Sequence, residues 1–284
     1  MKVLIFGNLT IDENVTESGT YRGVGGSSYF AGMVFSNFGH QVTVISPRGK
    51  DFPLTQLNSI DLQPKDPVSL STLTFRNVMT AKGRVQEVLY EKSARVYRPK
   101  DIPKRKTDVV IVAPLVDNMD SAFLGSVKEK FSRAMRVFLP QGKLRTLTSE
   151  GKVVKKQWQS CREIVSQFHI IVYSREDMEK PDEVASLWSS QGTIVIVTKD
   201  KDGCSVYIHR KRTDIPGVPE DKIVDSTGAG DIFAASFVHQ FAKSREAIDA
   251  AKFANLIASH SLRLYPNQLE KIRNPKHEFR YSNL

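Results

Sequence analysis

The residues best suited to chemistry lie between Asp225 and Asp231, where the chain reads DSTGAGD. Gly228 and Gly230 flank Ala229 at the start of a segment with helical period, and such a glycine pair lets backbone N–H groups come close to an anion. The first N–H groups of a helix have no partner within it and lie at its positive end, so they favour phosphate. The segment therefore predicts an anion hole suited to a phosphoryl group in transfer.

Asp231 directly follows this glycine turn. A carboxylate there would point into the same pocket, where it can accept the proton of an attacking hydroxyl as phosphorus is approached in line. Asp231 is therefore predicted to be a general base. The alternative reading is that Asp231 only caps a helix and the glycines only form a turn, because glycine-rich helix starts are common.

A second group of candidate ligand-binding residues lies near the N-terminus. Asp12 comes shortly after residues 3–6, an apolar run typical of a buried parallel strand, and ligands of open α/β sheets bind outside the carboxyl ends of such strands. A carboxylate accepts two hydrogen bonds and suits vicinal hydroxyls. Gly25 and Gly26 would let the backbone approach the same ligand. A loop-capping role is the alternative for Asp12.

Short apolar runs alternate with segments of helical period along the chain. The predicted strands are residues 3–6, 42–45, 109–112, 136–139, 170–173 and 193–197, and the predicted helices are residues 27–38, 121–131, 158–168, 228–242 and 244–262. This alternation favours an α/β fold with a doubly wound, mostly parallel sheet and helices on both faces. Residues 10–22 and 70–96 break the rhythm and predict a small antiparallel sheet that stands off the core.

Three local features follow from the same patterns. Ile223 and Val224 form a strand-like start to the DSTGAGD segment. Ser244 is placed as the N-cap of the last helix. Lys82 and Gly83 are a turn candidate between the two strand-like runs of residues 70–96.

The sequence resembles the ribokinase-like (PfkB-type) carbohydrate kinase family over nearly its whole length. DSTGAGD is similar to that family's C-terminal signature, D-T-x-G-A-G-D, and residues 25–46, GGSSYFAGMVFSNFGHQVTVIS, are similar to its N-terminal signature. GNLTID at residues 7–12 resembles the first strand with its substrate-contacting Asp, and Gly49 to Asp51 resembles the following G-x-D. The off-core strands of residues 10–22 and 70–96 match that family's β-sheet lid, and Ala254 and Asn255 fall on the late helix that flanks its adenine pocket. One such match is weak evidence, but five in the right order, beside DSTGAGD itself, are a specific signal.

This resemblance implies a single ribokinase-like domain over residues 1–284, with residues 10–22 and 70–96 as a β-sheet lid. It implies transfer of the γ-phosphoryl group of ATP, with Mg²⁺ on the phosphates, to a hydroxyl of a small sugar or a polyol such as inositol. A nucleoside as the acceptor, and a family member that binds ligand but transfers phosphate poorly, are the alternatives. The lid would close over the acceptor and exclude water, and a homodimer through the lid is a further expectation.

Each family role can be carried over to residues of this chain. The acceptor would be bound by Asp12, Gly25, Gly26 and Asp51. Asp225 would organise the loop of the C-terminal signature, near a monovalent cation such as K⁺ in some members. The nucleotide would be bound by Ser174, Thr198, Asp200, Gly203 and Asn255, and Mg²⁺ would be ordered by Glu176 and Asp177.

Several of these positions depart from the family pattern. The N-x-x-E motif appears as residues 174–177, SRED, and the T-x-G-x-x-G motif has Asp200 in place of its first glycine. Residues 139–145, LPQGKLR, resemble the D-x-Q-G-x-x-R of one branch, with Leu at its first position. Tyr29 and Phe30 stand where the family usually has Asn, and helical geometry predicts that only one of the two rings faces the ligand.

Composition sets limits on the other classes of function. The 284 residues carry a net charge of +10, but the basic residues are scattered, with no arginine-rich tail, which speaks against a nucleic-acid-binding protein on the same fold. No apolar stretch approaches the length of a membrane span. Cys161 and Cys204 lack the spacing of a zinc site or a disulfide framework. We expect a cytoplasmic protein, with ATP available to it and no nucleic-acid or membrane partner.

Overall fold

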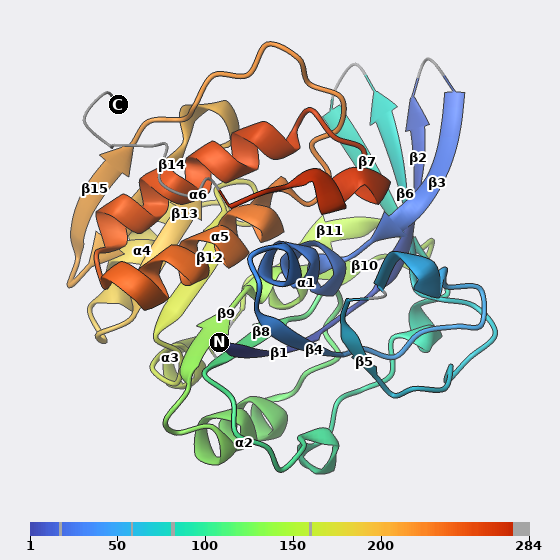
Figure 1. Ribbon diagram of the computed structural model, residues 1–284, viewed down its shortest axis with the longest axis horizontal. Coiled ribbons are helices and arrows are strands. Elements are labelled where there is room, and N and C mark those ends of the chain that lie inside the picture. The colour runs from blue at the N-terminus through green and yellow to red at the C-terminus, as the bar shows by residue number, and fades with distance from the viewer. Residues whose placement is uncertain (17–18, 58, 81–82, 159–160, 275–284) are drawn as a thin grey trace.

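A large sheet forms the centre of the computed structural model, which describes residues 1–16, 19–57, 59–80, 83–158 and 161–274. Its strands are β1 (Lys2–Gly7), β4 (Gln41–Ile45), β5 (Asp61–Gln63), β8 (Val109–Ala113), β9 (Met135–Phe138), β12 (Ile170–Ser174), β13 (Ile194–Thr198), β14 (Cys204–Ile208) and β15 (Lys211–Ile215). They lie in the order β15-β14-β13-β12-β9-β8-β1-β4-β5 (Figure 1). The pairings from β13 to β5 are parallel, while β14 and β15 are antiparallel.

Helices cover both faces of this sheet, as predicted. One face carries α1 (Ser27–Asn37), α5 (Ala229–Ser244) and α6 (Ala247–Ser261), and the other carries α2 (Ser121–Lys130), α3 (Cys161–Val165) and α4 (Pro181–Ser189). Successive side chains of β1 point to opposite faces of the sheet. Ile5 packs in the hydrophobic core under α1 and α5, and Phe6 packs in the core on the opposite face. Burial on both faces explains why the parallel strands read as continuous apolar runs.

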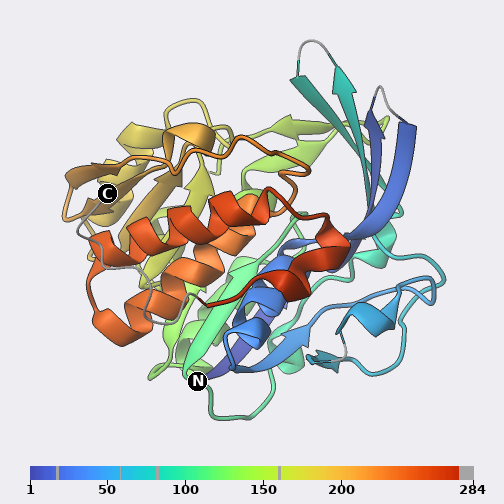
Figure 2. The ribbon, with the colours of Figure 1, turned by 45° about the horizontal axis from the view of Figure 1, so that its top comes forward.

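A smaller sheet projects from the main body (Figure 2). It contains β3 (Gly19–Gly25), β2 (Thr10–Thr16), β6 (Thr74–Thr80) and β7 (Gly83–Leu89), in that order. The prediction of a separate small sheet is confirmed, but the prediction that it is wholly antiparallel is wrong, because β2 pairs with β6 in parallel. The long connection between these two strands permits this, since only antiparallel neighbours can be joined by a tight turn. Lys82, the first residue of the predicted turn, lies outside the described residues.

Shorter elements complete the chain. A two-stranded sheet pairs β10 (Arg145–Leu147) with β11 (Val153–Lys155). The 3₁₀ turns are η1 (Leu54–Leu57), η2 (Glu91–Ser93), η3 (Pro99–Asp101), η4 (Pro140–Lys143), η5 (Asp200–Asp202) and η6 (Pro266–Lys271). In the part of the chain that the structure describes, no helix has both the length and the apolar character needed to cross a membrane.

Two local predictions are wrong. Ile223 and Val224 belong to no strand and are exposed, because the backbone N–H of Val224 donates to the carbonyl of Leu262 at the end of α6 instead of to a sheet neighbour (2.7 Å). Ser244 is the last residue of α5, and Glu246 is the N-cap of α6. The Ser244 hydroxyl still accepts the N–H of Glu246 (3.1 Å), so it bridges the two helices.

The buried phenol of Tyr97 ties together the ends of two central strands. Its hydroxyl is placed to donate to the carbonyl oxygens of Gly7 (2.6 Å) and Ile45 (2.7 Å). We predict that Tyr97→Phe lowers the free energy of unfolding by about 2 kcal/mol, since the substitution leaves buried carbonyls without a donor. Urea denaturation checks this, with Tyr90→Phe as the control because Tyr90 is exposed. Equal stability of the two variants would contradict the assigned role.

Candidate functional site

The N-terminus of α5 is shaped by a steric constraint on Gly228. This residue is the N-cap and has the left-handed conformation, with φ 78° and ψ 0°. A Cβ at Gly228 would lie 2.3 Å from the ring of Phe30, so no other residue fits there without movement. Gly230 differs, because a Cβ built on it meets no atom of the described part of the chain within 4 Å. The two glycines are therefore not equivalent: the protein's own packing requires the first, and the second faces open space.

Asp231 lies in the first turn of α5, and its half-buried carboxylate accepts a hydrogen bond from the side chain of Ser27. Burial raises the pKa of Asp231 to about 7, and the neighbouring carboxylates of Asp177 and Asp12 act in the same direction. The hydrogen bond from Ser27 and the positive charge of Arg145 oppose this rise in pKa. A carboxyl group with a pKa near neutrality can exchange protons at physiological pH.

Asp12 reaches this cluster from β2 and is 7% exposed. Its Oδ1 accepts a hydrogen bond from the Thr10 hydroxyl (2.8 Å), and a Cβ on Gly25 would lie 2.2 Å from its Oδ2. Gly26 has φ 94°, and a Cβ there would lie 2.3 Å from the carbonyl oxygen of Asn8. Both glycines lie in close contact with polar atoms of the protein itself, and the contact at Gly25 fixes the Asp12 carboxylate. The approach of these glycines to a ligand stays a prediction.

Asp51 is placed at the base of the small sheet. Its Oδ1 accepts hydrogen bonds from both the backbone N–H (2.8 Å) and the hydroxyl (2.6 Å) of Thr72, and its Oδ2 lies 3.7 Å from the guanidinium of Arg22. Thr72 lies two residues before β6, and Arg22 lies on β3. Asp51 therefore anchors the strands of the small sheet, whatever ligand it also contacts.

The structure separates the two candidate metal ligands that follow β12. Glu176 is exposed, whereas the Asp177 carboxylate accepts hydrogen bonds from the backbone N–H of Ser174 (2.9 Å) and from the side-chain amide of Gln141 (3.4 Å). Burial raises the pKa of Asp177, and the positive charge of Arg145 opposes this. Within the described residues no three His, Cys, Asp or Glu side chains group into a ready metal site.

The turn after β13 shows why Asp can occupy position 200. Asp200 has φ 52°, a left-handed conformation that glycine adopts most easily and that Asp tolerates better than most residues. Gly203 has φ 86°, and a Cβ there would lie 2.2 Å from the carbonyl oxygen of Ile215, so this glycine is required. The Thr198 hydroxyl lies 3.4 Å from the carbonyl oxygen of Tyr173. The departure from T-x-G-x-x-G therefore keeps the turn.

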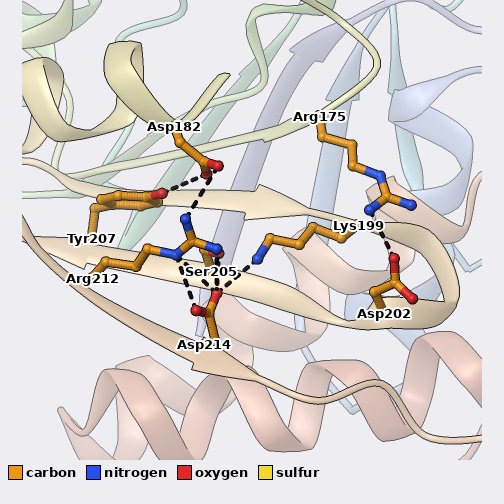
Figure 3. A network of polar contacts seen from close by, with 8 residues as sticks. All are labelled: Arg175, Asp182, Lys199, Asp202, Ser205, Tyr207, Arg212 and Asp214. Carbon is orange, nitrogen blue, oxygen red and sulfur yellow. Dashed lines mark hydrogen bonds and ion pairs between the residues drawn. The ribbon is translucent and has the colours of Figure 1, made fainter. Parts of the chain in front are cut away.

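Ion pairs hold the same turn in place on its exposed side (Figure 3). Asp202 pairs with Arg175 (2.8 Å), and Lys199 pairs with Asp214 of β15 (2.7 Å). Asn255 of α6 is 7% exposed, and its side-chain amide donates a hydrogen bond to the backbone carbonyl of Pro216, directly after β15 (2.9 Å). The candidate nucleotide residues Thr198, Asp200 and Gly203 thus lie at the turn between β13 and β14, and Asn255 supports the backbone that follows β15.

Asp225 connects the small sheet to the glycine turn. Its Oδ1 accepts the backbone N–H of Thr227 (2.7 Å), and its Oδ2 accepts a short hydrogen bond from the hydroxyl of Tyr21 on β3. The ring of Tyr21 also packs edge to face against Tyr265. Both oxygens of the Asp225 carboxylate are therefore already engaged within the protein.

Arg145 is the main site residue that was not among the predicted ones. It follows η4, and its guanidinium lies over the ring of Phe75, 4.9 Å from the centroid. It donates to the carbonyl of Leu115 (2.7 Å) and to the side chain of Gln86 on β7 (3.1 Å). The signal that could have found it is the QGxxR spacing of residues 141–145. Tyr29 and Phe30 are each 1% exposed, so the prediction that one of them faces a ligand is wrong.

Comparison with known proteins bears on these residues. Residues 133–265 match the sequence profile of the pfkB family carbohydrate kinases. A probable fructokinase-5 of Arabidopsis thaliana is 34% identical over 97 residues, a match that spans 34% of this chain and only 30% of that protein. The cytidine kinase of Thermococcus kodakarensis is 23% identical over 263 residues, covering 86% of this chain and 90% of that protein.

Solved structures share the fold over most of the chain. A pyrophosphate-dependent kinase in the ribokinase family, complexed with a pyrophosphate analog and myo-inositol, superimposes with a TM-score of 0.78 at 17% identity, covering 92% of this chain and 95% of that one. Ribokinase from Thermotoga maritima gives a TM-score of 0.70 at 15% identity, covering 94% and 95%. Residues 133–265 are thus similar in sequence to the pfkB family carbohydrate kinases, and the chain as a whole has the ribokinase-like fold of these solved structures.

Proposed function

We propose that the protein transfers the γ-phosphoryl group of ATP to a hydroxyl of a small sugar or polyol, with Asp231 as the general base. The observation that carries this proposal is the position of Asp231. Its carboxyl group has a pKa of about 7 and lies in the first turn of α5, next to the open space at Gly230. A base of this pKa and an anion-binding helix N-terminus side by side are what in-line phosphoryl transfer requires.

The acceptor would bind between the two carboxylates. Asp12 would accept hydrogen bonds from vicinal hydroxyls, and Asp231 would take the proton of the hydroxyl that attacks phosphorus. The positive charge of Arg145 acts on the carboxyl groups of both Asp231 and Asp177 and opposes the rise in their pKa. Arg145 would therefore stabilise the ionised base and orient polar groups of the acceptor. The small sheet, tied to the site through Tyr21 and Asp225, would act as the lid that excludes water.

The donor would place its terminal phosphate at the N-terminus of α5, against the N–H groups near Ala229 and Gly230. Mg²⁺, when bound with ATP, would neutralise charge on the phosphates, and Asp177 is a better candidate than the exposed Glu176 to hold it. The turn at Thr198 to Gly203 would contact the nucleotide. A single domain over residues 1–284, a cytoplasmic location and a homodimer through the lid complete the proposal.

A nucleoside is the second candidate for the acceptor. The long match to a cytidine kinase favours it. Against it, Tyr29 and Phe30 are buried and engaged: the Tyr29 hydroxyl donates to the carbonyl of Pro266 (2.7 Å), and the Phe30 ring packs on Gly228. Neither ring is available to stack on a base, so a polyhydroxylated acceptor is the better proposal. The fold neighbour complexed with myo-inositol adds support.

An acceptor screen tests the proposed reaction. We expect ATP consumption with Mg²⁺ to depend on a sugar or an inositol in a panel of sugars, polyols and nucleosides. Asp231→Asn serves as the inactive control because it keeps the shape of the side chain and removes the proton acceptor. Turnover with cytidine or adenosine alone would overturn the polyol class and leave the kinase proposal intact, whereas no acceptor-dependent turnover with any compound would contradict both.

The pKa of Asp231 makes a prediction about pH. A base acts in its ionised form, so kcat/KM should fall about tenfold per unit of pH below about 7 and level off above it. Asp231→Asn should lose roughly a hundredfold or more in kcat and lose this pH dependence. Arg145→Gln should move the profile to higher pH, because its charge lowers the pKa of Asp231. A profile that is flat between pH 5 and 8 in the wild type would rule out Asp231 as the base.

The two glycines of the turn should respond differently to alanine. Gly228→Ala forces a side chain into a left-handed conformation against Phe30 and should cost roughly 1–3 kcal/mol of stability. Gly230→Ala meets open space and should fold normally, yet its methyl group would crowd a phosphate bound there and lower turnover roughly tenfold or more. Thermal denaturation and turnover, measured on both variants, separate the two effects. Wild-type turnover in Gly230→Ala would show that no phosphate binds beside this residue.

A further inference from the structure

Arg48 is a buried cation whose hydrogen-bonding capacity is mostly unused. It follows β4, is 3% exposed, and donates through one terminal nitrogen to the carbonyl of Lys65. Its Nε has no hydrogen-bond partner among the described residues. Burial lowers the pKa of Arg48, and Asp66 attracts it electrostatically, but among the described residues no carboxylate lies within ion-pair distance of it. A buried charge without a partner is costly, so this arrangement calls for an explanation.

Arg136 shows how the same fold satisfies a buried arginine. This residue is 8% exposed, and its guanidinium donates to the backbone carbonyls of residues 131, 132, 134 and 167 at 2.8–3.3 Å. Carbonyl groups thus surround its donors, as expected for an arginine that only ties loops together. Arg48 has one such carbonyl. The difference indicates that the remaining donors of Arg48 serve something other than the backbone.

A cavity of about 210 Å³ lies where those donors could act. It is lined by Arg48 and Lys65 and by the apolar side chains of Leu54, Leu57, Ile60 and Leu62. Of the two cations that line the cavity, Lys65 already forms an ion pair with Asp61 (2.7 Å), so Arg48 is the one available to bind an anion there. The residues that line the cavity come from η1, from the edge strand β5 and from the segments next to them, and none of the residues described around Asp231 is among them. Its volume is below that of a typical drug-sized pocket, so it suits a smaller molecule.

We propose that this cavity binds a small organic anion, with a carboxylate or phosphate head group paired with Arg48 and a short apolar chain against Leu57, Ile60 and Leu62. A planar guanidinium offers a fork of donors that matches the two oxygens of such a head group. The apolar walls bind a chain of a few carbons and would gain nothing from a bare inorganic ion. This is a second ligand site, separate from the proposed acceptor and donor sites.

The site is connected to the base of the small sheet. Gly49, next to Arg48, donates its N–H to the Thr72 hydroxyl (3.0 Å), and the Asp51 carboxylate accepts two hydrogen bonds from Thr72. The carbonyl of Arg48 accepts the N–H of Val68 (2.9 Å). An anion on Arg48 would therefore order residues 48–51, and with them the entrance to β6, which makes the site a candidate for regulation by a small metabolite.

Thermal denaturation with hexanoate as the probe tests the proposal. We expect hexanoate to raise the Tm of the wild type saturably, and inorganic phosphate at the same ionic strength to raise it less. Arg48→Met should have a Tm no lower than the ligand-free wild type, since it removes an unpaired buried charge, and should show no response to hexanoate. An equal response to hexanoate in the wild type and in Arg48→Met would overturn the site.

A second variant keeps the test decisive if Arg48→Met folds poorly. Leu54 lines the cavity and is 49% exposed, so Leu54→Glu would supply a carboxylate to Arg48 from the chain itself. We expect this variant to have a raised Tm and at least tenfold weaker binding of hexanoate. Leu187→Glu is the matched control, because Leu187 is similarly exposed (54%) and lies on α4, away from the cavity. If both glutamate variants behave alike, Arg48 does not serve an anion in this cavity.

Discussion

The contact between Gly228 and the ring of Phe30 fixes the position of the candidate base. Phe30 belongs to α1 and Gly228 begins α5, so the ring sets how closely the two helices approach at their N-termini. Because the left-handed conformation at Gly228 aims the first turn of α5, the same contact places Asp231 beside Ser27, at the start of α1. The steric requirement at Gly228 thus determines where the Asp231 carboxylate lies and allows Ser27 to form a hydrogen bond with it.

The carboxylates gathered around Asp231 lower the stability of the folded protein instead of raising it. The carboxylates of Asp12 and Asp177 both raise its pKa, and Arg145 is the cation that opposes them. Like charges gathered in a partly buried site cost folding free energy, and such clusters are found where a pKa must be shifted for chemistry. The excess of negative charge also means that a phosphate donor would need an accompanying cation to approach, which fits donation from a Mg²⁺–nucleotide complex rather than from the free nucleotide.

The sequence predicted the parts of the fold that depend on local pattern. Six of the seven parallel strands of the main sheet, all but β5, and the helices α1, α2, α5 and α6 could be predicted because burial of both sheet faces and of helix faces leaves a periodic pattern in the sequence. The β14–β15 hairpin was missed because its exposed residues, such as Arg212 and Asp214, break the apolar run. The parallel pairing of β2 with β6 and the place of Arg145 were missed for another reason. Both depend on contacts between distant segments, which no local pattern encodes.

The departures from the family motifs have different physical meanings. Asp200 stands in place of the glycine of the motif and has a positive φ, a conformation that glycine adopts most easily, so Asp is accommodated in this turn beside the candidate nucleotide site. Asp225 keeps the family residue, yet both of its oxygens are engaged, one by the turn at Thr227 and one by Tyr21 of the small sheet. The shape of the glycine turn and the position of β3 are therefore coupled through one carboxylate. Any movement of the small sheet that breaks the hydrogen bond from Tyr21 leaves the Asp225 carboxylate with one donor fewer beside the glycine turn. A movement of the small sheet would therefore alter the surroundings of the proposed phosphate site.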